Sequence, residues 1–177
     1  MQLISVTQAL SPYFKQLEKI RPDILENAAA RGTEVHVKCA LIAQNLYPCY
    51  EVSGIEGYVI SFRLWFESQV TEVLAVERRF EHAAFGFFGH PDLVVKMKEG
   101  HTALIDLKTP ATLSKLWRSQ ISAYKFLVRE QYPDVKSIGS LRLNPDGKTP
   151  KMDWYETDHK DFAVFLSALN AYRNLLL

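Results

Sequence analysis

The sequence predicts a mixed α/β fold in which a central β-sheet carries helices on its faces. Three observations predict this class. Apolar residues recur at helical spacing within residues 1–70. The spacing changes to the alternation of strands within residues 71–109, and helical and strand patterns then alternate to the C-terminus. We therefore expect a single domain over residues 1–177, with N-terminal helices in 1–70 and the sheet core in 71–177.

Two helices are expected before the strands. Residues 22–46 have helical spacing, and Pro22 suits the first turn of such a helix. Gly32 is a candidate break between a short helix and a longer one. Residues 55–69 repeat the helical pattern. The N-terminal third is therefore expected to be helical.

The remaining elements follow from the same patterns. Strands are expected at 71–79, within 84–98, at 101–109, at 135–143 and at 151–156. Helices are expected at 112–131 and 159–177. The Glu99-Gly100 turn predicts a hairpin between the second and third strands. This order favours a mixed sheet covered by helices.

Composition excludes several classes of protein. The chain has 177 residues, of which 21 are Lys or Arg and 20 are Asp or Glu, so its near-neutral charge does not indicate a nucleic-acid coat protein. Its two cysteines, Cys39 and Cys49, cannot supply an iron–sulfur cluster that needs four. No signal peptide or membrane-spanning run is visible, so we expect a cytoplasmic protein without a membrane partner.

The residues that indicate chemistry lie at two predicted strand ends. Asp106 and Lys108 follow the apolar run Ala103–Ile105 and share one face of their strand. Asp92 lies one hairpin upstream, and carboxylates on neighbouring strands can converge on one hard cation such as Mg²⁺. Such a cation promotes phosphodiester hydrolysis, and Lys108 could orient the attacking water or stabilise the transition-state charge. The alternative is an exposed Asp106–Lys108 ion pair of little energetic value.

Two further groups of residues gain interest from that pair. Gln120 and Tyr124 share a helical face and could hold the lysine or a phosphate; the alternative is a surface Gln beside a packed Tyr. His36 borders the apolar stripe of its helix and becomes a candidate third metal ligand, although a lone helical His is more often structural. Gly147-Lys148-Thr149 lacks the preceding glycine of a P-loop and is expected to form a turn.

Taken in order, the segments RGTEVH, LAVERRF, GHPDLV, ALIDLKTP and QISAYKFL resemble the RecB-type branch of the PD-(D/E)XK nucleases, especially its small phage-encoded exonucleases. The resemblance implies a restriction-endonuclease-like core and a Mg²⁺- or Mn²⁺-dependent deoxyribonuclease, with an exonuclease in phage or prophage recombination as the favoured form. Helicase-linked relatives carry a nucleotide-binding domain for which this chain has no room.

The resemblance also implies residue roles. Its metal ligands would be His36, Asp92, Asp106 and the backbone carbonyl of Leu107. Lys108 would be the catalytic lysine, and Gln120 and Tyr124 would match the Gln-x-x-x-Tyr motif of the branch. Glu77 matches a strand glutamate upstream of the first aspartate and would be an outer ligand or a partner for Lys108; the alternative is an ordinary charge at a strand edge.

A nuclease also needs contacts with DNA. The basic residues close to the motifs in sequence are Arg78, Arg79, Lys115, Arg118 and Lys125. Trp117 could stack on a base or pack in the core. The near-neutral chain predicts modest, salt-sensitive affinity, so any processivity would come from a homo-oligomer or a recombination protein partner.

Two other functions stay open at this stage. The chain could be a catalytically silent nuclease-fold module that binds DNA or protein. It could also be an unrelated α/β interaction protein in which the motif order arose by chance. Metal occupancy at Asp92 and Asp106 and turnover on DNA would separate the silent module from the nuclease. A structure with Asp92 and Asp106 far apart would support the unrelated protein.

Overall fold

A computed structural model of the chain describes residues 2–14, 21–46, 54–110, 113–156 and 159–176. Its largest element is a five-stranded mixed sheet in the order β2-β5-β6-β7-β8. The strands are β2 (Val70–Val76), β5 (Leu93–Met97), β6 (Thr102–Lys108), β7 (Val135–Arg142) and β8 (Lys151–Tyr155). Only the β6–β7 pair in this sheet is parallel. The predicted mixed α/β class is confirmed.

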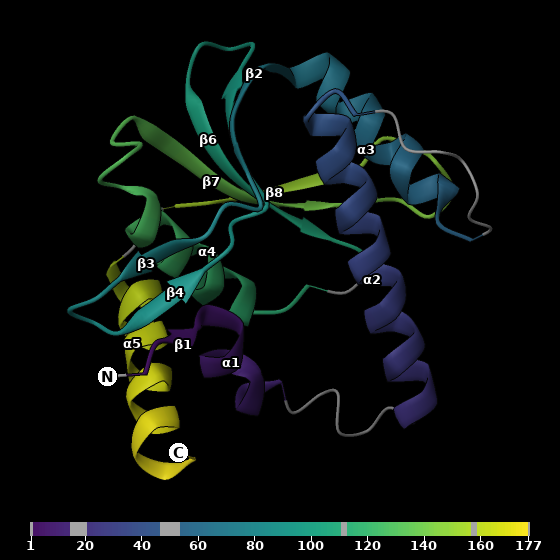
Figure 1. Cartoon of the computed structure of the whole chain (residues 1–177). Coiled ribbons are helices and arrows are strands. Elements are labelled where there is room, and N and C mark those ends of the chain that lie inside the picture. The colour runs from purple at the N-terminus through teal and green to yellow at the C-terminus, as the bar shows by residue number, and fades with distance from the viewer. Residues whose placement is uncertain (1, 15–20, 47–53, 111–112, 157–158, 177) are drawn as a thin grey trace.

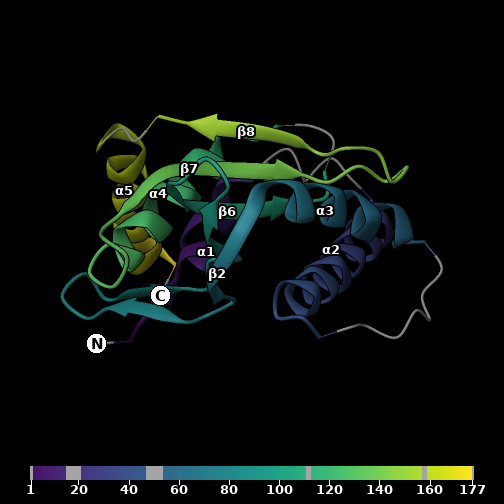
Figure 2. The same ribbon diagram turned by 90° about the horizontal axis from the view of Figure 1, so that it is seen from above.

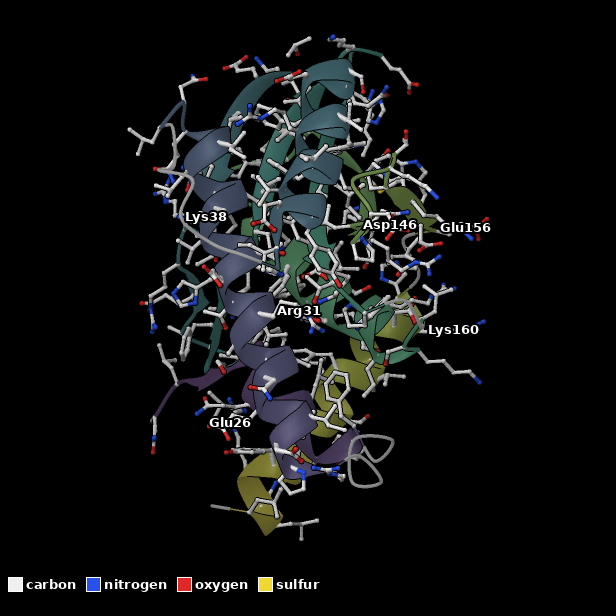
Figure 3. All side chains as sticks on the ribbon, turned by 90° about the vertical axis from the view of Figure 1, so that its right-hand side faces the viewer. Glu26, Arg31, Lys38, Asp146, Glu156 and Lys160 are labelled. Carbon is white, nitrogen blue, oxygen red and sulfur yellow. The ribbon has the colours of Figure 1, made fainter. Side chains whose placement is uncertain are left out.

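Helices cover both faces of this sheet (Figure 1). One face carries α2 (Pro22–Ala43) and α3 (Glu56–Gln69), and the other carries α1 (Val6–Leu10), α4 (Leu116–Val128) and α5 (His159–Leu175). Strand alternation separates two apolar cores: Ile105 and Leu107 pack towards α2 and α3, whereas Leu104 packs towards α4 and α5. The sheet lies between these two layers of helices when seen from above (Figure 2).

A second, three-stranded sheet was not expected from the sequence. Its strands β1 (Ile4–Ser5), β4 (Phe87–Gly89) and β3 (Phe80–His82) lie in the order β1-β4-β3. The strand predicted within 84–98 is present as β5, but the short strand β4 before it was not predicted; the chain leaves the small sheet at Gly89 and enters the large sheet at Leu93. Pro91 lies between them and cannot donate to a β-ladder.

Other boundaries also differ from the expectations. Gly32 lies inside a continuous α2, so the predicted break is wrong. The strand expected over 71–79 ends at Val76, since Glu77 has a left-handed backbone with φ 46°. The other expected elements are present with ends shifted by a few residues, as is usual for element boundaries. Cys49 and the predicted start of a helix at residue 112 lie outside the described residues.

The N-terminal residues belong to the sheet core and not to the helices that follow them. β1 pairs in parallel with β4, and α1 contributes Val6 and Leu10 to the core beneath α4 and α5. Ser5 and Gln8 form a capping box that starts α1. No helix of the described residues is long and apolar enough to cross a membrane.

Candidate metal and catalytic site

Three strand ends meet at one edge of the large sheet. β5 runs antiparallel to both β2 and β6, so the end of β2, the start of β5 and the end of β6 lie together. These ends carry Glu77, Asp92 and Asp106–Lys108 respectively. Helix α2 crosses nearby and contributes His36. The topology therefore gathers residues that are 72 positions apart between His36 and Lys108.

Asp92 is at the centre of the site. Its Oδ2 accepts a hydrogen bond of 2.6 Å from the backbone amide of Leu107, and its Oδ1 lies 3.2 Å from Nδ1 of His36. Burial raises the pKa of Asp92, but the charges of His36 and Lys108 and the hydrogen bonds from His36 and the Leu107 amide together outweigh burial, and the net shift is downward. Asp92 is therefore held as a carboxylate in a fixed orientation.

His36, Glu77 and Asp92 each offer one ligand atom, and these atoms all lie within 4.8 Å of one another. One imidazole nitrogen and two carboxylate oxygens suit Mn²⁺ as well as Mg²⁺. Glu77 reaches the cluster because its backbone turns out of β2, and its amide donates a 3.1 Å hydrogen bond to the carbonyl of Asp92. The sequence pattern gave Glu77 a place on a strand, whereas its position depends on leaving that strand.

At neutral pH and below, protons compete with a cation for the ligand atoms of this cluster. Burial lowers the pKa of His36, but the charge and hydrogen bond of Asp92, together with the Asp106 charge, outweigh burial and raise the pKa to about 9. Burial, together with the Asp92 charge, raises the pKa of Glu77 to about 7. Both residues must therefore give up protons to act as ligands near neutral pH.

Asp106 and Lys108 occupy the other half of the site. Both side chains leave the face of β6 that points towards α4, and Lys108 Nζ lies 2.6 Å from Asp106 Oδ2. Burial raises the pKa of Asp106 although the Lys108 charge opposes the shift. The Asp106 and Lys108 side chains are 3% and 13% exposed, so they do not form the solvated surface pair considered as an alternative.

Helix α4 holds the lysine. Gln120 Oε1 accepts a 3.0 Å hydrogen bond from Lys108 Nζ, and Gln120 Nε2 donates to the Tyr124 hydroxyl at 3.1 Å. Both α4 side chains are buried. The four-residue spacing of Gln120 and Tyr124 thus produces a chain of contacts that ends on the ammonium group.

Six of the predicted site residues line one small pocket of about 240 Å³, whereas Glu77 lines a neighbouring pocket that also includes His36. The lining of the small pocket includes His36, Asp92, Asp106, Lys108, Gln120 and Tyr124. Sequence reasoning assigned no site role to the five other lining residues, Ser5, Val6, Thr7, Gly89 and His90. The capping-box pattern Ser5-x-x-Gln8 could have indicated the N-terminal helix, but nothing in the sequence places that helix beside the pocket.

The predicted DNA-contact residues are not gathered at this pocket. Trp117 is 5% exposed, and Lys108 Nζ lies 5.5 Å from the centroid of the Trp117 ring. The ring is therefore packed in the protein, and the prediction that it stacks on a base is wrong. Arg118 pairs with Asp161 on α5 at 3.0 Å. Arg78 lies over Phe80, and Lys115 is exposed before α4. Leu107 reaches the site through its amide, and a role for its carbonyl stays a prediction.

Comparisons with known proteins do not assign the chain to a family. No family model matches the chain, and no curated protein is significantly similar to it. A solved structure described as "Crystal structure of SSO0001" matches with 13% sequence identity and a TM-score of 0.46, over 100% of this chain and 78% of that chain. A likeness at this level supports no inference about activity.

Proposed function

We propose that this protein is a divalent-metal-dependent nuclease that hydrolyses DNA phosphodiester bonds. The observation that carries the proposal is the arrangement around Asp92: a potential ligand cluster on one side, and on the other a buried lysine held by Asp106 and Gln120. A structural ion pair would not need a hydrogen-bonded chain that aims its ammonium into a pocket. Perturbed titratable groups gathered in a pocket are typical of functional sites.

The donor set fits a hard or borderline cation. His36, Glu77 and Asp92 would hold it, with Asp106 as a further carboxylate on the neighbouring strand. When bound, the cation supplies positive charge that polarises the scissile phosphate and activates a water. The nitrogen donor makes Mn²⁺ an effective substitute for Mg²⁺.

The chain's own residues then have separate tasks. Lys108 places its ammonium where negative charge develops on the phosphate, and Gln120 keeps that ammonium oriented between turnovers. Tyr124 fixes the amide of Gln120, so that its oxygen faces the lysine. The amide of Leu107 fixes the Asp92 carboxylate, which leaves the other Asp92 oxygen towards His36.

The decisive test is digestion of end-labelled linear, circular and single-stranded DNA with Mg²⁺ and with Mn²⁺. We expect cleavage that stops with EDTA and is lost in Asp106→Asn. The matched control is Asp153→Asn. Asp153 on β8 forms a partly buried 2.6 Å ion pair with Arg142 on β7 but does not line the pocket. Cleavage of linear but not circular DNA would support the exonuclease form.

Two outcomes would contradict the proposal. Full activity in Asp106→Asn would place the reaction elsewhere. Mn²⁺ binding without any cleavage of the three DNA forms would instead identify a silent nuclease-fold module.

A further inference from the structure

A flat cationic surface lies beside the proposed site. The guanidinium carbon of Arg79 lies 3.6 Å from the centroid of the Phe88 ring, the distance of a face-to-face stack. Glu81 Oε2 accepts hydrogen bonds from Nε and Nη2 of Arg79 at 3.4 and 3.3 Å. The guanidinium is thus fixed on one face and along one edge, and the side chain stays 46% exposed.

Strand geometry explains why an aromatic side chain is available there. Along β4, Phe87 is fully buried and Gly89 packs against Tyr124, whereas Phe88 points to the opposite face and is half-buried. Phe88 pairs with Ser5 of β1 and Glu81 of β3, so it lies on the central strand of the small sheet. An outward-facing Phe on a central strand has no packing role in the two apolar cores described above.

This surface is continuous with the pocket. The His90 ring lies 5.7 Å from the Phe88 ring at an interplanar angle of 89°, and His90 and Ser5 both line the pocket that contains Asp106 and Lys108. Arg79 follows the ligand Glu77 by two residues, which limits their Cα separation to about 7 Å. A nucleotide next to a phosphate in the pocket would therefore come within reach of Arg79.

Resting on the proposed function, we propose that Arg79, positioned by Phe88 and Glu81, is a stacking platform for an unpaired nucleobase next to the scissile phosphate. Guanidinium planes and aromatic rings both stack on bases, and such stacking does not depend on sequence. A base inside a duplex has both faces covered by its neighbours. The substrate class is therefore nucleic acid with unpaired nucleotides at the cleavage point.

A second arginine stacked on a phenylalanine ring provides a control for Arg79. The guanidinium carbon of Arg129 also lies 3.6 Å from a phenylalanine ring, that of Phe126. Arg129 follows α4 and is nine residues beyond Gln120, about 13 Å along a helix. It does not line the pocket. Replacing either arginine by lysine retains the charge and removes the plane.

The experiment measures fluorescence anisotropy of a short labelled oligonucleotide with Mg²⁺, in an Asp106→Asn background so that the strand stays intact. We expect Arg79→Lys to weaken binding of the single strand about tenfold, and binding of a blunt duplex less than about twofold. Arg129→Lys is expected to change neither. Phe88→Leu should reproduce the strand-specific loss with Arg79 intact, and its thermal unfolding identifies any loss due to misfolding.

Three results would overturn the platform. Arg79→Lys could leave single-strand binding unchanged, weaken duplex and single strand equally, or have the same effect as Arg129→Lys. These failures are distinct from failure of the proposed function, which is measured as cleavage by the protein with Asp106 intact. Strand-specific loss in a protein that cleaves nothing would retain the platform and reject the nuclease.

Discussion

The two sides of the site differ in how firmly their polar groups are held. On the β6–α4 side, comprising Asp106, Lys108, Gln120 and Tyr124, the side chains contact one another in sequence and are buried or nearly so. On the α2–β2 side, comprising His36 and Glu77, the side chains are 29% and 40% exposed and lie 3.9 Å apart. Under the proposed function, the first side would stabilise a developing negative charge, and the second side would hold the cation.

The largest expected effect is on the β6–α4 side. Lys108→Ala should lower the DNA cleavage rate by about 10²–10³-fold, because in the proposed mechanism it removes the positive charge beside the reacting phosphate. The measurement is kcat/KM on labelled single-stranded DNA.

Lys96 provides the control for that prediction. Its Nζ also lies 2.6 Å from a carboxylate oxygen, that of Glu72, but both side chains are about half exposed. Lys96→Ala should change the cleavage rate less than about twofold and the unfolding free energy by at most about 0.5 kcal/mol. Equal losses in the two variants would show that the buried pair has no special role.

The same contrast explains what the sequence could predict. Asp106, Lys108, Gln120 and Tyr124 lie on regular elements, where alternation and four-residue spacing determine which side chains share a face. Glu77 lies where β2 ends in a left-handed residue, and no local pattern predicts that turn. Trp117 lies one helical turn before Gln120. Whether its side chain points to solvent or to the core depends on tertiary packing, which here places it against Lys108.

The small sheet could not be predicted from the sequence for a similar reason. Its strands have two or three residues each, too few for alternation to be recognised, and the β1–β4 pair joins segments more than 80 residues apart. Ser5 and Thr7 line the pocket beside β4, with which β1 pairs, and His90 follows β4 directly. Long, regular elements were therefore predictable, whereas residues placed by tertiary pairing of short strands were not.

The second prediction concerns pH and the α2–β2 side. With the pKa of His36 at about 9 and that of Glu77 at about 7, cation binding must displace protons. Mn²⁺ affinity should therefore rise by about tenfold per unit between pH 7 and pH 9, and more steeply below pH 7. Isothermal titration calorimetry in buffers of different ionisation enthalpy would measure both affinity and proton release.

The free energy of unfolding of the metal-free protein should fall as the pH rises, whereas Mn²⁺ affinity should increase. A raised His36 pKa contributes stability that is complete below pH 6.5 and is lost as the pH rises through about 9. A raised Glu77 pKa likewise removes stability between pH 4.5 and about 7. Urea unfolding should therefore give a free energy that falls across this range. A His36→Ala variant with the same pH dependence above pH 7 would contradict the assignment.

The third prediction tests how tightly the β6–α4 side is packed. A Cβ at Gly89 would lie 2.5 Å from Cε1 and 2.8 Å from Cδ1 of Tyr124. Gly89→Ala should therefore displace the Tyr124 ring and lower the unfolding free energy by about 1–3 kcal/mol. Because Tyr124 fixes Gln120, the cleavage rate should also fall, by about tenfold. Unchanged stability would mean that this side can rearrange.

The smallest effect should come from the same substitution on the open side. A Cβ at Gly32 would meet only Thr109 Oγ1 within 4 Å, at an ordinary contact distance of 3.6 Å. Gly32 lies inside α2, where glycine costs about 0.5–1 kcal/mol relative to alanine. Gly32→Ala should therefore raise the unfolding free energy by up to this amount and leave Mn²⁺ affinity within about twofold. Opposite signs at Gly89 and Gly32 would support the contrast between the two sides, whereas destabilisation at both would show that α2 is packed as closely as α4.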